Sequence, residues 1–225
     1  MASSSAVISS EEKEAGVALV DIGGGTTDIA IFHDGIIRHT SVIPFGGNVI
    51  TEDIKEGCTI MQRQAELLKT KFGSAVTQTS QENEVVCIPG LRGRDPKEIS
   101  VTNLANIINA RMSEILEHIY FEIKNSGYEK KLIGGIVVTG GGSQLKHMNQ
   151  LIEFTTGMDS RVGYPNEHLS SNTNIEYIKG NQPIHILSKR VDQNNKSIGI
   201  ELFPHKIIVQ QSNLHHFLVY ALLLK

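Results

Sequence analysis

Residues 17–32 form two apolar runs that are joined by a turn of three consecutive glycines. The first run is Val17–Ile22, the turn is Gly23–Gly25, and the second run extends to Phe32. Short apolar runs on either side of a glycine turn are typical of an antiparallel β-hairpin. Glycine permits positive φ angles, and without a Cβ its backbone N–H group can approach an anion closely. The pattern therefore predicts a hairpin whose turn is open to a ligand.

Polar side chains flank this turn on both sides. Thr26 and Thr27 place hydroxyl groups directly after the glycines, and Asp21 lies where the first strand meets the turn. Mg²⁺ prefers hard oxygen ligands and retains several waters, so we expect Asp21 to hold Mg²⁺ through water. The expected phosphate contacts are Gly23, Gly24, Gly25, Thr26 and Thr27. In the alternative interpretation, the glycines serve only the turn and Asp21 caps neighbouring N–H groups.

The turn differs from the two commonest phosphate-binding motifs. It lacks the Lys-Ser/Thr pair of a P-loop and the helix-opening spacing of a dinucleotide fingerprint. The sequence therefore predicts a third kind of nucleotide loop, after which Asp28 is expected to be structural. No His or Cys grouping supports nucleophilic catalysis, because His215 and His216 have no partner at ligand spacing. We predict no catalytic residue.

A second triple glycine lies farther along the chain. An apolar run over Lys131–Thr139 predicts a strand, and the pattern after the glycines predicts a helix over Gln144–Phe154. A strand, a glycine turn and a helix N-terminus together form a common anion or nucleotide seat. The expected contacts there are Gly140, Gly141, Gly142 and Ser143. The two turns have different flanks, so we interpret them as two sides of one ligand site and not as an internal repeat.

The remaining segments predict an alternation of strands and helices. A third strand follows the Asp34-Gly35 turn over Ile36–Val42, and a helical pattern opens at Gly46-Gly47-Asn48. Apolar residues of one face predict a long helix from Thr102 to about Lys124, capped by Thr102 or Ser100. Further expected elements are a helical segment containing Ala65 and Leu68, a short strand within Glu84–Gly90 and a charged loop over Arg92–Pro96.

Composition excludes several classes of protein. The chain has 225 residues, 40% of them hydrophobic, which suffices for a sizeable core. A net charge of −3 gives no electrostatic reason to expect binding of nucleic acid, which usually requires a concentrated basic face. Cys58 and Cys87 lack metal-ligand spacing, which favours a reducing compartment. We expect neither a secretion signal nor a run of about 20 apolar residues that could span a bilayer.

Five blocks of the sequence resemble the actin-like ATPases and, within that superfamily, the bacterial cell-division family FtsA. The blocks are Val20–Phe32, Ile37–Asn48, Ala65–Gly73, Ile136–Ser143 and Arg161–Pro165. The resemblance implies an α/β fold, an actin-like (ribonuclease H-like) subdomain with an inserted smaller α+β subdomain. The core would comprise residues 16–47 and 129–173, and the insertion residues 48–128. Residues 1–15 would be a lead-in, and residues 174–225 form a divergent tail that the resemblance does not explain.

The resemblance also implies a ligand. Gly23–Thr27 would hold the β- and γ-phosphates of ATP with Mg²⁺, and Gly140–Ser143 would pass beneath the nucleoside. Glu66 and Lys69 match residues that contact ribose and adenine in similar proteins. From spacing alone, a Glu and a Lys three residues apart on a helix also fit a surface ion pair.

The function implied by the resemblance is that of an adaptor. FtsA-like proteins bind ATP, associate into filaments and link FtsZ filaments to the membrane at the division site, on the cytoplasmic side. The inserted subdomain would receive the acidic and apolar C-terminal peptide of FtsZ, and Arg111 is the nearest match to a peptide-binding residue. Helical spacing alone makes Arg111 a solvated surface charge.

The resemblance covers only the second lobe of an actin-like ATPase. The first lobe, with its own phosphate loop, has no counterpart in this sequence, so we expect weak ATP binding and no efficient hydrolysis by this chain alone. The end of the chain has one lysine and little polar face over Leu214–Lys225, so membrane contact is expected to be indirect or lost. The alternatives are a lobe of a rod-shape or pilus-assembly actin homologue, or of a chaperone-type or sugar-kinase-type ATPase.

Overall fold

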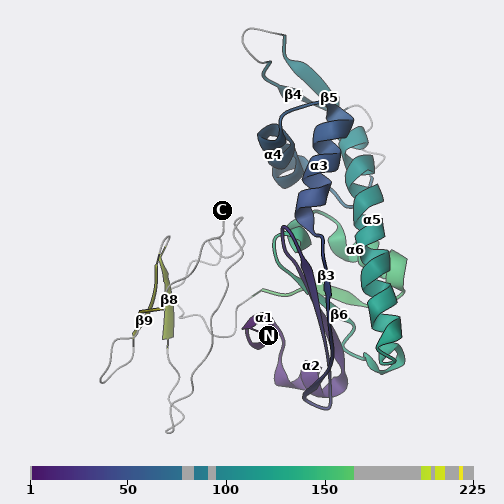
Figure 1. Cartoon of the computed structure of the whole chain (residues 1–225), viewed down its shortest axis with the longest axis vertical. Coiled ribbons are helices and arrows are strands. Elements are labelled where there is room, and N and C mark those ends of the chain that lie inside the picture. The colour runs from purple at the N-terminus through teal and green to yellow at the C-terminus, as the bar shows by residue number, and fades with distance from the viewer. Residues whose placement is uncertain are drawn as a thin grey trace. The chain divides into compact units, whose positions relative to one another are not determined.

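The computed structural model of the chain describes residues 2–77, 84–90, 95–164, 199–203, 206–210 and 218–219. The chain divides into two compact units, each of which is described by itself. One unit is Ser10–Val162, which contains both glycine turns (Figure 1). The other unit joins residues 1–9 to residues 163–225. Its described elements are helix α1 (Ala2–Val7) and an antiparallel sheet of β8 (Gly199–Phe203), β9 (Lys206–Gln210) and β10 (Leu218–Val219).

The unit Ser10–Val162 is built on a five-stranded mixed sheet with the strand order β3-β2-β1-β6-β7. Its strands are β1 (Val17–Ile22), β2 (Thr27–His33), β3 (Ile36–Ile43), β6 (Ile136–Thr139) and β7 (Ser160–Val162). The first three form an antiparallel meander, and β6 and β7 extend the sheet in parallel with β1. The α/β class and the meander predicted from the sequence are confirmed.

One face of this sheet carries most of the core. Side chains alternate across a strand, so every second residue of β1 and β2 points to the same face. On that face lie Ala18, Val20, Ile22, Ile29 and Ile31, all buried. They belong to one apolar cluster with Ile115, Leu116, Ile119 and Ile123 of helix α5 (Val101–Asn125). The long predicted helix is confirmed, and its cap is Ser100, whose side chain accepts a hydrogen bond from the backbone N–H of Asn103.

A short helix, α2 (Ser10–Ala15), lies on the opposite face of the sheet. The ammonium of Lys13 is 5.6 Å from the centre of the Phe32 ring of β2. Glu12 accepts two hydrogen bonds of 2.8 Å from the guanidinium of Arg161 on β7. Such paired contacts fix geometry as well as charge. Helix α2 therefore contacts β2 on one side of the first strand and the edge strand β7 on the other.

Between the meander and β6 the chain forms a layer of helices with a β-ribbon at its far end (Figure 1). Helices α3 (Gly47–Cys58) and α4 (Gln62–Phe72) pack beside α5. The ribbon consists of β4 (Val85–Ile88) and β5 (Lys97–Ser100), which pair antiparallel. The predicted helices and the short strand within Glu84–Gly90 are confirmed, whereas residues 92–94 of the predicted charged loop lie outside the described residues.

Two predicted elements have the wrong bounds. The strand predicted over Lys131–Thr139 is limited to Ile136–Thr139, because Gly135 has a φ of 65° and forms a turn in which its N–H bonds to the carbonyl of Leu132. Residues 129–131 form a 3₁₀ turn. The apolar run thus reaches the sheet only after a pair of glycines has redirected the chain.

The helix predicted over Gln144–Phe154 begins later, at Met148, and is α6 (Met148–Thr156). The second glycine turn leads instead into a short 3₁₀ turn, Gly142–Gln144. Lys146 pairs with Ser74 in an isolated β-bridge, and its carbonyl accepts a hydrogen bond from the N–H of Ala75. This pairing with a distant segment keeps the chain extended before α6, so no α-helix N-terminus follows the glycines directly.

Within the described residues, no helix combines the length and the apolar character needed to cross a bilayer.

The different burial of two isoleucines predicts different effects of their replacement on stability. Ile54 of α3 is 0% exposed within the core cluster, whereas Ile133, before β6, is 83% exposed. We expect Ile54→Ala to lower the free energy of unfolding by about 2–5 kcal/mol, because it removes buried methyl groups and leaves a cavity. Ile133→Ala should change it by no more than about 0.5 kcal/mol. Urea unfolding followed by circular dichroism measures both, and equal effects would contradict the described packing.

Candidate functional site

The first glycine turn is a compact link between β1 and β2. The N–H of Gly23 donates to the carbonyl of Thr26 at 2.9 Å, and Ile22 pairs with Thr27. None of the three glycines has a positive φ. The tightest backbone approach is at Gly23, where a Cβ would lie 3.0 Å from the carbonyl oxygen of Thr26. Gly24, Gly25 and Thr26 are exposed, so the tip of the turn is open.

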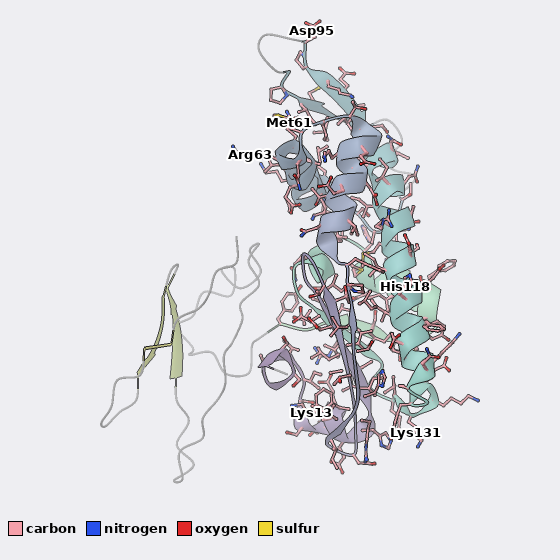
Figure 2. The ribbon with its side chains drawn as sticks, viewed as in Figure 1. Lys13, Met61, Arg63, Asp95, His118 and Lys131 are labelled. Atoms are coloured by element: carbon pink, nitrogen blue, oxygen red, sulfur yellow. The ribbon has the colours of Figure 1, made fainter. Side chains whose placement is uncertain are left out.

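The two threonines of this turn have different environments. Thr26 is exposed, whereas Thr27 is completely buried and its hydroxyl donates to the carbonyl of Phe45 at 2.9 Å. That bond ties the base of the turn to the segment before α3. Phe45 in turn packs edge-on against His118, with ring centres 5.2 Å apart. Figure 2 shows His118 in the C-terminal half of α5.

Helix α3 begins against the first glycine turn. The N–H of Gly47 donates to the carbonyl of Gly23 and the N–H of Asn48 to that of Gly24, both at 2.8 Å. The first N–H groups of a helix have no partner within it, so the turn supplies acceptors for two of them. A Cβ on Gly46 would clash with the carbonyl of Gly23. The turn and the first residues of α3 are therefore a single hydrogen-bonded unit.

The second glycine turn lies beside the first, because β1 and β6 are parallel neighbours and each is followed by one of the turns. Asp21 pairs with Thr139, directly before Gly140. Gly140 has a φ of 86°, and a Cβ there would lie 2.5 Å from Oδ1 of Asp21 and 2.5 Å from the carbonyl oxygen of Ile22. Asp21 thus lies between the two turns.

The second turn is closed by its own serine. The hydroxyl of Ser143 is buried and donates to the carbonyl of Gly140 at 2.8 Å. Gly141 is exposed, and a Cβ there would meet nothing within 4 Å. A ligand at this turn would therefore meet backbone at Gly141, and Ser143 would act by holding the turn in shape.

Glu66 and Lys69 of α4 form the ion pair expected from their spacing, with 2.8 Å between Lys69 Nζ and Glu66 Oε2. Only the lysine of this pair is shielded from solvent, since its side chain is 13% exposed whereas that of Glu66 is 47% exposed. Its ammonium also donates to the carbonyl of Gly47 at 2.9 Å and to the hydroxyl of Thr51 at 2.7 Å. The pair therefore reaches the start of α3, which binds the first glycine turn.

Sequence reasoning missed Thr51 and the role of Asn48 in this arrangement. Thr51 lies one helical turn after Gly47 on α3 and is 3% exposed. A polar residue on the buried side of an apolar helix is the signal that could have identified it, because buried hydroxyls need partners. The side-chain amide of Asn48 is what a Cβ placed on Gly24 would meet.

Arg111 lies on α5 and is engaged by carboxylates. Its guanidinium donates to both oxygens of Asp53 on α3, at 2.5 and 3.0 Å, and to Glu114 at 2.6 Å. The hydrogen bond to Asp53 is the main reason why the pKa of Arg111 is raised above its ordinary value. The side chain retains 33% of its exposure. Arg111 thus joins α3 to α5. It is not the solvated surface charge that helical spacing alone predicts.

The carboxylates of the site do not form a metal cage. Among the residues that the structure describes, no group of three or more His, Cys, Asp or Glu side chains could hold a metal ion. Two carboxylates lie beside the first turn, Asp21 and its partner across the hairpin, Asp28, and Asp21 is the one next to the second turn as well. A magnesium ion held there through water, as predicted, would take its other ligands from water and phosphate.

The second glycine turn provides a stringent test of this geometry. Gly140→Ala should destabilise the chain by at least about 1–3 kcal/mol, because alanine at a left-handed φ is strained and its Cβ would meet Asp21 and Ile22. Gly141→Ala is the matched control, since Gly141 has a φ of −63° and open space around it. Thermal unfolding monitored by circular dichroism measures both variants. Equal melting temperatures would show that Gly140 is not confined as described.

Comparisons with known sequences identify the family. The family model described as "Cell division protein FtsA" matches residues 18–182. The chain is 40% identical over 165 residues to the cell division protein FtsA of Pseudomonas aeruginosa, covering 73% of this chain and 40% of that protein. It is 37% identical over 166 residues to that of Bacillus subtilis, covering 74% and 38%. The chain thus spans about two fifths of the length of the curated relatives that it matches.

Comparisons with solved structures identify the fold. The crystal structure of MreB5 of Spiroplasma citri bound to ADP has a TM-score of 0.61 at 24% identity, covering 72% of this chain and 52% of that one. The same protein bound to AMPPNP gives 0.59 at 26% identity, covering 71% and 51%. These likenesses confirm the predicted actin-like fold. With the sequence matches, they establish that this chain belongs to the cell division protein FtsA family.

Proposed function

We propose that this chain forms one side of the ATP site of an FtsA-type protein. The observation that carries the proposal is the convergence of three predicted groups on one junction. The first glycine turn binds the start of α3, Asp21 lies between the two turns, and the pair Glu66–Lys69 reaches Gly47. Residues from four separate segments thus meet where the sheet ends and the inserted helices begin.

Each group has a proposed role. The exposed tip of Gly23–Thr27 would hold the β- and γ-phosphates, with Asp21 binding Mg²⁺ through water. Gly140–Ser143 would pass beneath the nucleoside, and Glu66 with Lys69 would contact its ribose and adenine side. When bound, Mg²⁺ would neutralise phosphate charge. The crystallised MreB5 relatives carry ADP and AMPPNP, which supports a nucleotide as the ligand of this fold.

The proposed activity is binding and not turnover by this chain alone. Actin-like ATPases close two lobes on the nucleotide, and each missing hydrogen bond to charged phosphate would cost about 1.5–3 kcal/mol. Two such losses correspond to a reduction in affinity of about 100-fold or more. In this proposal residues 16–47 and 129–173 form the core of one lobe and residues 48–128 its inserted subdomain.

At the level of the whole protein, we propose an ATP-dependent adaptor that associates into filaments and links FtsZ filaments to the membrane at the division site, on the cytoplasmic side. Membrane attachment by this chain would be indirect. The partner-binding part would be the inserted subdomain, which would receive the acidic and apolar C-terminal peptide of FtsZ. Arg111 supports this role, because an acidic peptide could replace Asp53 or Glu114 as the partner of its guanidinium.

The magnesium role of Asp21 can be tested against a neighbouring aspartate. Asp28 is exposed and stands opposite Asp21 in the hairpin register, so Asp28→Asn is a matched control. We expect weak ATP binding by the unchanged chain, strengthened about tenfold by Mg²⁺, which equals about 1.4 kcal/mol. Asp21→Asn should abolish that gain and Asp28→Asn should keep it. Titrations followed by NMR shifts detect such weak binding.

Two outcomes would contradict this proposal. The same ATP affinity with and without Mg²⁺ in the unchanged chain would remove the metal role. Steady phosphate release that disappears in Asp21→Ala would show that the chain hydrolyses ATP by itself.

The partner proposal predicts binding of a labelled FtsZ C-terminal peptide in fluorescence anisotropy. Arg111→Gln should weaken binding at least fivefold, because the guanidinium is lost. Arg63→Gln makes the same change at an exposed residue of α4, labelled in Figure 2, and should bind as the unchanged chain does. Circular dichroism confirms that each variant is folded. Absence of binding by the folded chain would favour a partner of another actin-like system, such as rod-shape or pilus-assembly proteins.

A further inference from the structure

The hydroxyl of Thr51 lies at the centre of the contacts that hold Glu66 and Lys69. Its oxygen is 2.5 Å from Oε2 of Glu66 and 2.7 Å from Nζ of Lys69, and it is 3.3 Å from the carbonyl of Gly47 one helical turn earlier. Thr51 comes from α3, whereas the two charged residues come from α4. Thr51 is thus the side chain by which α3 contacts this pair of α4.

The chemistry of the three groups fixes the direction of these hydrogen bonds. An ammonium can only donate and a carboxylate can only accept, whereas a hydroxyl has one proton and two acceptor sites. Lys69 therefore donates to Thr51. The single proton of Thr51 has two acceptors within reach, and we assign it to Glu66 at 2.5 Å because the carbonyl of Gly47 is farther away, at 3.3 Å. The three N–H groups of Lys69 have three acceptors within 2.9 Å, which are Gly47, Thr51 and Glu66. The ammonium is fully occupied by the protein.

Both contacts to the Glu66 carboxylate use the same oxygen, Oε2. The Glu66 side chain nevertheless remains 47% exposed. A carboxylate has a second oxygen with its own acceptor sites. The arrangement orients Glu66 from one side and leaves its Oε1 atom available for a donor outside the protein.

We infer that Thr51 and Lys69 are positioning residues that hold Glu66 so that Oε1 accepts a hydrogen bond from a ribose hydroxyl of the nucleotide. This inference rests on the proposed ATP site, and it assigns a separate role to each of the three residues on the nucleoside side of that site. Glu66 accepts the hydrogen bond from the ligand. Lys69, which the proposed function places at the nucleoside together with Glu66, acts there by neutralising and orienting Glu66, and Thr51 connects both to α3. The ligand class is a nucleotide with free ribose hydroxyls. A hydroxyl that donates to a charged carboxylate forms a stronger hydrogen bond than one that donates to a neutral acceptor.

The test uses three ligands that separate the nucleoside from the phosphates. ATP, its 2′,3′-dideoxy analogue and inorganic tripolyphosphate are titrated with Mg²⁺ into the full chain, followed by NMR shifts. The unchanged chain should bind ATP about tenfold more tightly than the dideoxy analogue. Thr51→Val should remove this preference and leave the affinity for tripolyphosphate unchanged. Thr51→Ser, which restores the hydroxyl, should keep the preference.

A second buried threonine provides the matched control. Thr156 of α6 is 6% exposed, and its hydroxyl donates to the carbonyl of Ile152, four residues earlier. Thr156→Val removes a hydroxyl in the same manner away from α3 and α4, and should behave as the unchanged chain does. A Thr51→Val variant that retains the preference for ATP would overturn the inference. An unchanged chain that binds none of the three ligands would instead overturn the proposed ATP site.

The positioning role also has a readout that needs no ligand. Acetylation of individual lysines, measured by mass spectrometry at short times, reports how firmly each ammonium is held. Thr51→Val should raise the rate at Lys69 several-fold relative to Lys71 on the same helix, and Thr51→Ser should not. Equal rates at Lys69 in all variants would overturn the positioning role, whatever the nucleotide titrations give.

Discussion

The architecture depends on two backbone hydrogen bonds between the first glycine turn and the start of α3. The N–H groups of Gly47 and Asn48 have no acceptor within their own helix, and the carbonyls of Gly23 and Gly24 supply one each. The bonds satisfy a helix N-terminus without a capping side chain, and they fix the turn against the inserted helices. The Thr27–Phe45 bond and the Lys69–Gly47 bond both add to this same junction.

Local pattern predicted the elements whose partners lie nearby in the chain. The meander and α5 follow from apolar periodicity over long segments, and Ser100 was one of two predicted caps, with Thr102, because capping is local. The start of α6 was wrong because it depends on distant pairing, and the start of β6 was wrong because the apolar run conceals a local turn at Gly135 and a distant bond at Gly134. Lys146 is held by Ser74, and Gly134 by the carbonyl of Gly16, and neither partner leaves a trace in the neighbouring sequence.

For the candidate site, the sequence allowed the residues to be predicted but not their contacts. Residue type and resemblance pointed to Asp21, the two glycine turns and the Glu66–Lys69 pair, and the structure brings these groups to one junction. What the side chains do there was not predictable. Thr27 and Ser143 give their hydroxyl protons to backbone carbonyls, and Thr51 is a buried partner from another helix. Such roles are set by three-dimensional neighbours and not by residue type.

Helix α3 has a mechanical consequence for the molecule. Gly47 contacts the glycine turn, and Asp53, six residues later, holds the guanidinium of Arg111. At 1.5 Å per residue the two lie about 9 Å apart along the helix axis. A helical segment this short is rigid, and it has a hydrogen bond to another segment at each of its ends. A shift of the start of α3 at the glycine turn would therefore also move Asp53 relative to Arg111.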